Sequence, residues 1–168
     1  MNKQTKSALS AGLLLFRGNV VALEVLLVHP GGPFFTKKDE GAWSIPKGEA
    51  LPGEDLLTRA KTEFGEELGI QVEGELIPLG SIRQKGGKTV HAWAVKGDLP
   101  SAFQFRSNTF EMEWPPRSGR RQVFPEIDRA EFFSEERARR KINPAQVELI
   151  DRLGRALRQM ASPAGDRE

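Results

Sequence analysis

The chain contains no cysteine and only two histidines among its 168 residues. Without cysteine it can form neither a disulfide nor a thiolate centre, which fits a reducing compartment such as the cytoplasm. The two histidines, His29 and His91, lie far apart in the sequence, which argues against a histidine-based zinc site. Any metal site must therefore use mainly oxygen ligands, which Mg²⁺, Mn²⁺ and Ca²⁺ prefer.

The sequence has no strong excess of either charge, and it has no long apolar run. Its 25 basic and 23 acidic residues leave a net charge of +2, which gives no argument for a nucleic-acid partner. The apolar stretch at residues 11–16 is too short to span a membrane, and Arg17 follows it without a cleavage site. We therefore expect a cytoplasmic protein with no membrane partner. Its length suits a single domain over residues 1–168, with a loose tail from about residue 162.

The order of patterns along the chain predicts an α/β fold. Strands are expected at residues 7–16, 20–28, 71–83, 89–95 and around 132–133, and the first two should pair as a hairpin. Helices are expected at residues 54–68, 135–141 and from 143 or 144 to about 160. The aromatic segment 102–114 is expected to cover the sheet, and the basic segment 115–121 to be irregular.

The helix predicted at residues 54–68 carries an unusual acidic face. Glu63, Glu66 and Glu67 are spaced i, i+3 and i+4, so the three carboxylates lie on one side of the helix. Like charges this close repel one another unless a cation lies among them. An acidic face of this kind is most often simply solvated, so the triplet alone leaves both interpretations open.

Residues 48–70 resemble the Nudix box of the Nudix hydrolase family. In that box a glycine, a glutamate, an Arg-Glu pair, a Glu-Glu pair and a final glycine follow one another at fixed spacing. The matching residues are Gly48, Glu54, Glu63, Phe64, Glu66, Glu67, Gly69 and Ile70. The resemblance implies an α/β/α sandwich with a mixed sheet. It also implies metal-dependent hydrolysis of a pyrophosphate linkage in a nucleotide-type, phosphorylated small molecule.

The resemblance also implies the roles of individual residues. Glu63, Glu66 and Glu67 would be catalytic and would bind Mg²⁺, or Mn²⁺ in its place, with the Gly48 carbonyl as a further ligand. Glu63 is either a ligand or the general base. Many family members add a glutamate from a loop outside the box. Glu126 is the first candidate for this glutamate, because it precedes the strand expected near residues 132–133.

Several other residues complete the expected site. Glu111 and Glu113 are the other candidates for the additional glutamate. Glu54 lies out of phase with the acidic triplet, and we expect it to brace the preceding loop or to interact with the N-terminal helix dipole rather than to bind metal. Basic residues near the box and in the irregular segment are expected to bind phosphates of the substrate. These are Lys47, Arg117, Arg120 and Arg121.

The sequence departs from the box at one position, where Thr62 replaces the usual arginine. That arginine usually holds a catalytic carboxylate in place. Arg59 lies four residues before Glu63 and could form an i,i+4 ion pair with it instead. The loss of the arginine leaves an alternative open, namely a weakened Nudix-fold module that binds nucleotides or regulates. A calcium-binding protein is disfavoured because the alternating acidic loop is absent.

A substrate with several phosphates, such as a dinucleoside polyphosphate, is the leading expectation. The WSIPKG sequence before the box is similar to that of family members that act on diadenosine or inositol polyphosphates. The sequence indicates neither the leaving group nor the oligomeric state.

Overall fold

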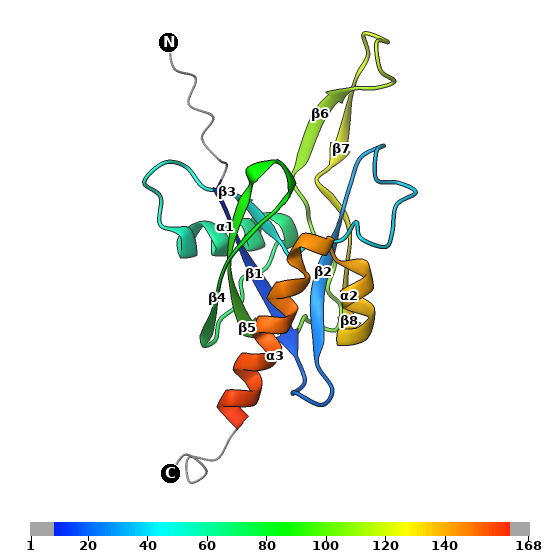
Figure 1. Ribbon diagram of the computed structural model, residues 1–168. Helices are drawn as coiled ribbons and strands as arrows, with labels where there is room; N and C mark the ends of the chain where they lie inside the picture. The colour runs from blue at the N-terminus through cyan, green and yellow to red at the C-terminus, as the bar shows by residue number, and fades with distance from the viewer. Residues whose placement is uncertain (1–8, 162–168) are drawn as a thin grey trace.

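The structure, a computed structural model, describes residues 9–161 (Figure 1). Its strands are β1 (Leu9–Arg17), β2 (Glu24–Pro30), β3 (Lys47–Glu49), β4 (Leu76–Arg83), β5 (Thr89–Lys96), β6 (Thr109–Glu113), β7 (Arg121–Pro125) and β8 (Ile127–Ser134). Its helices are α1 (Leu56–Leu68), α2 (Glu135–Lys141) and α3 (Val147–Ala161), with 3-10 turns at Lys85–Gly87 and Pro144–Gln146. None of the helices in this part of the chain has the length and apolar character needed to cross a bilayer.

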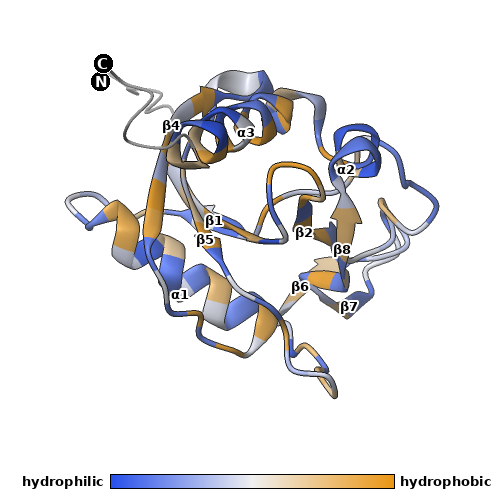
Figure 2. Ribbon diagram, turned by 90° about the horizontal axis from the view of Figure 1, so that it is seen from below, coloured by the Kyte–Doolittle hydropathy of each residue, from blue (hydrophilic) through white to orange (hydrophobic). Residues whose placement is uncertain are grey.

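Six strands form one mixed sheet. Their order is β4-β5-β1-β2-β8, and β3 pairs with the first half of β1. Strands β1 and β5 run parallel, whereas the other pairs of this sheet are antiparallel. Helix α1 covers one face of the sheet, and α2 and α3 cover the other (Figure 2). The predicted α/β/α sandwich with a mixed sheet is therefore confirmed.

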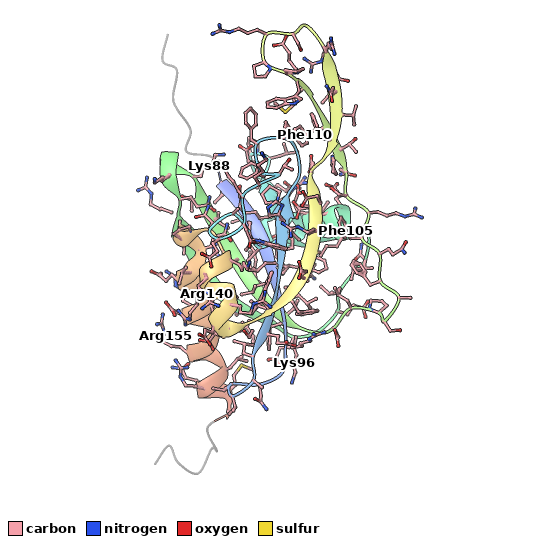
Figure 3. All side chains as sticks on the ribbon, turned by 90° about the vertical axis from the view of Figure 1, so that its right-hand side faces the viewer. Lys88, Lys96, Phe105, Phe110, Arg140 and Arg155 are labelled. Atoms are coloured by element: carbon pink, nitrogen blue, oxygen red, sulfur yellow. The ribbon has the colours of Figure 1, made fainter. Side chains whose placement is uncertain are left out.

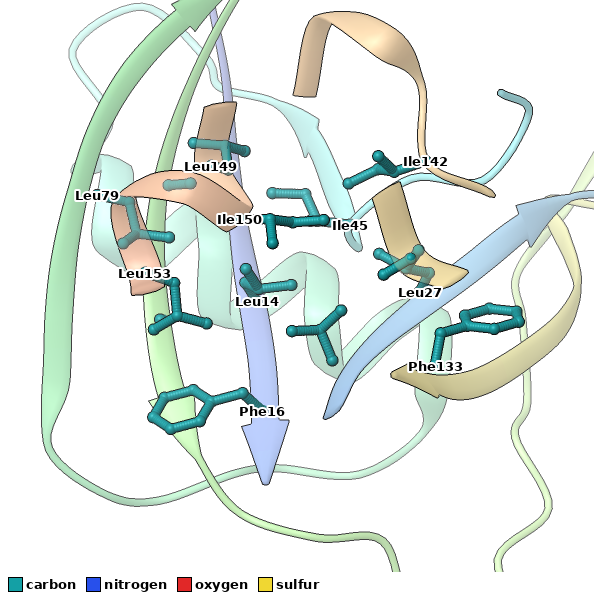
Figure 4. Packing of buried hydrophobic residues seen from close by; sticks show 14 of the residues in the cluster. Leu14, Phe16, Leu27, Ile45, Leu79, Phe133, Ile142, Leu149, Ile150 and Leu153 are labelled. Atoms are coloured by element: carbon teal, nitrogen blue, oxygen red, sulfur yellow. The ribbon is translucent and has the colours of Figure 1, made fainter. Parts of the chain in front are cut away.

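Each face of the sheet has its own hydrophobic core, because successive side chains of a strand point to opposite faces. On β1, Leu13 and Leu15 pack toward α1, whereas Leu14 and Phe16 pack toward α3 (Figure 4). A strand buried on both faces has a continuous apolar sequence. This explains the apolar run at residues 11–16.

The second strand begins later than the sequence predicts. Residues 20–28 are predicted as one strand paired with the first; the antiparallel pairing is confirmed, but β2 starts only at Glu24. The Asn19 side chain accepts hydrogen bonds from the backbone N–H groups of Val21 and Ala22, at 2.9 and 3.0 Å. Such local bonds compete with strand pairing. They hold the start of the segment in a bend and leave Val21 exposed.

The predicted strand at residues 71–83 is also shorter in the structure. Only its second part forms β4, and residues 71–75 have no regular structure. Within β4 the register against β5 shifts between Pro78 and Gly80. Gly80 has a φ of 76°, which glycine adopts without the steric cost of a side chain.

The segment at residues 102–114 covers the sheet only in its first part. Phe103 and Phe105 pack against the core on the α1 side. The second part forms β6, which pairs with β7 in a separate two-stranded hairpin. This hairpin projects from the rest of the domain (Figures 1 and 3). Segment 115–121 forms its turn, except that Arg121 already belongs to β7.

The two C-terminal helices largely follow the prediction. Ser134 caps α2, because its hydroxyl accepts the backbone N–H of Arg137 at 3.4 Å. The last helix is preceded by a 3-10 turn, so α3 proper starts a few residues later than expected. The tail predicted from about residue 162 lies outside the described residues, as do residues 7 and 8 of the first predicted strand.

Candidate functional site

Helix α1 carries the acidic triplet and has clear signals at both ends. Asp55 caps its start, since Oδ2 accepts the Thr58 backbone N–H at 3.0 Å and the Thr58 hydroxyl at 2.8 Å. Gly69 ends the helix in the left-handed conformation, with a φ of 76°. The apolar stripe that includes Phe64 and Leu68 packs against the sheet. This packing fixes the direction in which the acidic face points.

The three carboxylates of α1 lie at different depths. Glu66 is exposed, Glu63 is partly buried, and Glu67 is only 8% exposed. The Oε2 atom of Glu67 has no hydrogen-bond partner, and it is the one buried side-chain oxygen or nitrogen in residues 9–161 of which this is true. Buried polar atoms almost always have a partner. An unpaired carboxylate oxygen here marks a place suited to a cation.

The pKa values of Glu63 and Glu67 show that negative charges crowd together at this site. Burial, reinforced by the negative charges of Glu63 and Glu126, raises the pKa of Glu67 to about 8. Burial also raises the pKa of Glu63, against the opposing hydrogen bond from Arg59 and with a smaller contribution from Glu66. The structure therefore brings four of the predicted carboxylates into one electrostatic cluster.

Gly48 lies directly against this cluster. A Cβ atom at this position would be 2.1 Å from the Glu63 carboxyl carbon, which is far inside any real contact. Glycine therefore lets the backbone of β3 approach the acidic face while the Glu63 carboxylate keeps its present position; any side chain here would displace that carboxylate. The Gly48 carbonyl, which is the predicted backbone ligand, belongs to this same segment.

Arg59 forms the ion pair that the sequence predicts. Its Nη1 donates to Glu63 Oε1 at 3.0 Å, so the i,i+4 pair is confirmed. Its Nε and Nη2 also donate to the two oxygens of Glu54, each at 2.8 Å. Glu54 in turn accepts the Leu51 backbone N–H at 3.0 Å, which confirms that it braces the loop. Arg59 thus holds one of the predicted catalytic carboxylates, Glu63, in a chain that has Thr62 in place of the usual arginine.

Lys47 is the predicted basic residue that lies nearest to the carboxylates. Burial lowers the pKa of Lys47, the charge of Glu67 opposes this effect, and the positive charge of Lys88 adds to it. Lys88 lies in the turn before β5 (Figure 3). Lys88 was not among the predicted site residues, because its closeness to Lys47 comes from the side-by-side pairing of β5, β1 and β3. No spacing in the sequence reveals that pairing.

Glu126 lies at the base of the β6–β7 hairpin, directly before β8. Its backbone N–H donates to the Asn108 carbonyl at 2.8 Å, and its carbonyl accepts the Gly31 N–H at 2.9 Å. The side chain is exposed, yet its charge acts on both Glu63 and Glu67. The backbone is therefore fixed while the carboxylate remains accessible.

The other acidic and basic candidates lie on the projecting β6–β7 hairpin. Glu111 forms an ion pair with Arg121, and Glu113 accepts a backbone N–H from the turn. Arg117 and Arg120 belong to the turn between the two strands. Within residues 9–161, no hydrogen bond or ion pair joins these side chains to the carboxylates of α1. Their roles remain predictions.

The donor set suits a hard divalent cation, although the side chains are not arranged around one. Within the described part of the chain, no three histidine, cysteine, aspartate or glutamate side chains are placed to hold a metal ion together. Glu63 Oε1 accepts a hydrogen bond from Arg59. The fit rests on the unpaired oxygen of Glu67, the all-oxygen donors and the backbone of Gly48 against the cluster. A cation here would bind the unpaired Oε2 of Glu67 and offset the repulsion between the neighbouring carboxylates.

A buried glutamine, which the sequence analysis missed, supports the segment that leads into β3. Gln146 is fully buried, and its Oε1 accepts the Ile45 backbone N–H at 3.0 Å. Its Nε2 donates to Ser44 Oγ and to Gln84 Oε1, both at 3.0 Å. A glutamine in a polar segment before a helix gives no sequence signal for this role. It ties the start of the site to the C-terminal part of the domain.

A family model described as NUDIX domain matches residues 6–153. No curated protein sequence matches the chain. An Ap4A hydrolase from C. elegans, solved as a binary complex, has a TM-score of 0.62 at 23% identity over 89% of this chain and 98% of that one. The NUDIX domain of Shewanella oneidensis NrtR, complexed with ADP ribose, has a TM-score of 0.64 at 15% identity over 94% of both chains. At these identities the likeness concerns the fold.

Proposed function

Because the chain belongs to the NUDIX family, we propose that it is a hydrolase that cleaves a pyrophosphate linkage in a nucleotide-type substrate with a divalent cation. The observation that carries this proposal is the buried carboxylate of Glu67, whose Oε2 atom has no hydrogen-bond partner, beside Glu63 and Glu126. Such a carboxylate opposes folding when it is ionised, so stability alone gives no reason for it. Strongly perturbed acids of this kind gather at functional sites.

Mg²⁺ suits the proposed ligands best, and Mn²⁺ is the natural substitute. The side chains of Glu63, Glu66, Glu67 and Glu126 would hold the ion together with the Gly48 carbonyl. When bound, such an ion would neutralise charge on the phosphate oxygens and would lower the pKa of the attacking water.

The neighbouring residues would orient the carboxylates and bind the substrate. Since Arg59 holds Oε1 of Glu63, the other oxygen of Glu63 stays available to bind the ion or to accept a proton from water. Lys47 would neutralise a phosphate group beside the carboxylates. Its partial burial excludes water, which strengthens that interaction.

We further propose a polyphosphate substrate, such as a dinucleoside polyphosphate. The likeness of the fold to an Ap4A hydrolase supports this choice. A second support is the position of Arg117, Arg120 and Arg121 on a hairpin that projects from the domain near Glu126 (Figure 1). A substrate with several phosphates could extend from the carboxylates toward that hairpin.

A substrate panel tests the proposal. The purified protein should cleave at least one of dinucleoside polyphosphates, nucleoside triphosphates and nucleoside diphosphate conjugates in the presence of Mg²⁺ or Mn²⁺. Glu67→Gln should lower kcat/KM by about a hundredfold or more, because it removes a charged ligand. Glu73→Gln removes an exposed carboxylate outside the site and is the matched control. No cleavage anywhere in the panel, or full activity of Glu67→Gln, would contradict the proposal.

A binding or regulatory module with weakened turnover is the alternative, and Thr62 is the observation that favours it. It predicts that nucleotides bind without product formation and that Thr62→Arg restores turnover. The contacts of Arg59 with Glu63 argue for the hydrolase, because a positioning arginine is already present. The two candidates are distinguished by product analysis of the wild-type chain and of Thr62→Arg.

A further inference from the structure

His29, near the end of β2, is a buried titratable side chain that the proposed function does not use. It is fully buried, and its ring packs edge-on against Trp43 of the core beneath α2 and α3, at a centroid distance of 5.2 Å. Its Nδ1 lies 2.7 Å from Asp128 Oδ1, and its Nε2 lies 2.6 Å from the Lys38 carbonyl oxygen. One ring therefore joins β8 to the loop at residues 31–46, on the face of the sheet opposite α1.

These two partners require a positively charged ring. The Lys38 carbonyl can only accept a hydrogen bond, and so can an Asp128 carboxylate. The Arg129 guanidinium lies 3.9 Å from the same Oδ1 of Asp128, a contact that suits a carboxylate rather than a carboxylic acid. A neutral imidazole has a single N–H, so it would leave a lone pair against one of its two partners. Both contacts are satisfied together only when His29 donates from both nitrogens.

Asp128 occupies a bulge in the pairing of β2 with β8. The register shifts directly after His29, which makes Asp128 the extra residue on β8. A bulge bends its strand and re-aims the side chains beside it. Immediately beyond the bulge, the Gly31 N–H donates to the Glu126 carbonyl at 2.9 Å. The contact between His29 and Asp128 therefore holds the bend of β8 two residues after Glu126.

The other contact of His29 holds the loop at residues 31–46. Because the Lys38 carbonyl lies near the middle of this loop, the bond fixes the loop far from its two ends. Phe34 of the same loop packs edge-on against Trp114 at the far end of β6, with ring centroids 5.4 Å apart. The loop thus lies between the buried histidine and the hairpin that carries the basic candidates.

The charged groups around this ring come from three elements. β8 supplies Asp128 and Arg129, the loop supplies Asp39, and α2 supplies Lys141. Asp39 and Lys141 form an ion pair with each other. On β2 and directly after it, positions 25–36 contain no other charged side chain. Among the described residues, Asp128 is therefore the charged side chain that bonds to the ring.

We propose that His29 is a positioning residue, whose charged ring clamps the Glu126 segment of β8 to the loop at residues 31–46 and loses one of the two contacts when it gives up its proton. The proposal rests on the proposed hydrolase function, because Glu126 is one of the carboxylates that would hold the cation. Within residues 9–161 no hydrogen bond or ion pair joins the His29 ring to Glu126 or to the carboxylates of α1. It acts on the site through Asp128 and the loop.

Nitrogen NMR of the metal-free protein reads the charge of His29 directly. The chain has only two histidines, so His91→Gln leaves His29 as the sole imidazole. A doubly protonated ring gives two similar nitrogen shifts, whereas a neutral ring gives two widely separated ones. We expect the doubly protonated pattern at pH 6, and Asp128→Asn should move the loss of the proton to lower pH by about one unit or more. A neutral ring at pH 6, or a titration that Asp128→Asn leaves unchanged, would overturn the proposal.

Two matched substitutions separate the two contacts. His29→Asn places an amide donor near the position of Nδ1 and can keep the bond to Asp128. His29→Gln places its donor near the position of Nε2 and can keep only the bond to the Lys38 carbonyl. Calorimetric titration at pH 6 should therefore show Mg²⁺ binding weakened about tenfold or more in His29→Gln and much less in His29→Asn. Wild-type affinity in His29→Gln, or an equal loss in both variants, would contradict the positioning of Glu126 by His29.

The dependence of kcat on pH tests the same clamp in the working enzyme. The wild-type kcat should fall as the His29 ring loses its proton, and His29→Asn should lack this part of the fall, because an amide does not titrate. A fall that is unchanged in His29→Asn would assign it to another group and overturn the proposal. The NMR and Mg²⁺ measurements need no substrate, so they test the clamp even if the hydrolase activity itself is not found.

Discussion

Replacing Glu67 with glutamine should stabilise the metal-free protein. The Glu67 carboxylate is buried, and one of its oxygens has no hydrogen-bond partner. Its pKa is raised from the ordinary value of 4.5 to about 8. Because the folded state prefers the protonated form, stability from this group is fully present below pH 4.5 and is lost as the pH rises through 8. An amide of the same shape stays neutral and avoids that loss.

The size of the effect follows from the shift in pKa. A shift from 4.5 to about 8 corresponds to about 5 kcal/mol at most. For a chain of this length, 1 kcal/mol changes the melting temperature by about 2 to 4 °C. Relaxation of the side chain will absorb part of the cost, so we expect Glu67→Gln to melt about 5 to 15 °C higher at pH 8.5. Near pH 5 the difference should almost vanish.

Thermal unfolding followed by circular dichroism between pH 5 and 9 measures this difference, first with a chelator and then with Mg²⁺. Mg²⁺ should stabilise the wild type and have little effect on Glu67→Gln. The difference in melting temperature between the two proteins should therefore shrink or change sign when the ion is added. Glu73→Gln, which changes an exposed carboxylate, should follow the wild type at every pH. The reasoning is refuted if Glu67→Gln is less stable than the wild type at pH 8.5 without metal, or if the difference does not depend on pH.

Three further substitutions test other contacts of the site. Gly48→Ala places a methyl group against Glu63. It should lower the free energy of unfolding by about 1 to 3 kcal/mol and abolish the stabilisation by Mg²⁺. Urea unfolding with and without the ion measures both effects. Arg59→Lys loses the two-point contact with Glu54. It should lower kcat about tenfold or more with little change in KM. Steady-state kinetics in which only KM rises would contradict this expectation. Gln146→Leu leaves a buried backbone N–H without an acceptor and should lower the unfolding free energy by about 1 to 3 kcal/mol, and an unchanged urea midpoint would exclude this role.

The parts of the site that the sequence predicts are those that depend on local spacing. The positions of Glu63 and Glu67 on one helix follow from the period of 3.6 residues. The stop at Gly69 follows from the left-handed conformation that glycine adopts. The pair between Arg59 and Glu63 follows from i,i+4 spacing. Each of these needs only the helix that contains it, so no knowledge of the rest of the fold is required.

The parts that the sequence does not reveal depend on contacts between distant segments. Lys88 comes near Lys47 only because β5 pairs with β1, which pairs with β3. The burial of Gln146 depends on the segment before β3 packing against the C-terminal part. The late start of β2 has a different cause, because the side chain of Asn19 competes locally with an apolar pattern that is typical of a strand.

Arg59 also changes what the departure from the Nudix box at Thr62 implies. Positions one residue apart on an α-helix point about 100° apart, whereas positions four apart lie one above the other. An arginine four residues before Glu63 therefore reaches the carboxylate along the helix and can hold Glu54 at the same time. Glu54 is bonded to the loop that follows Gly48, so a single guanidinium joins this loop to the acidic face. We expect Arg59, one turn earlier, to act as the positioning arginine, and Thr62 is on this view weak support for a module without turnover.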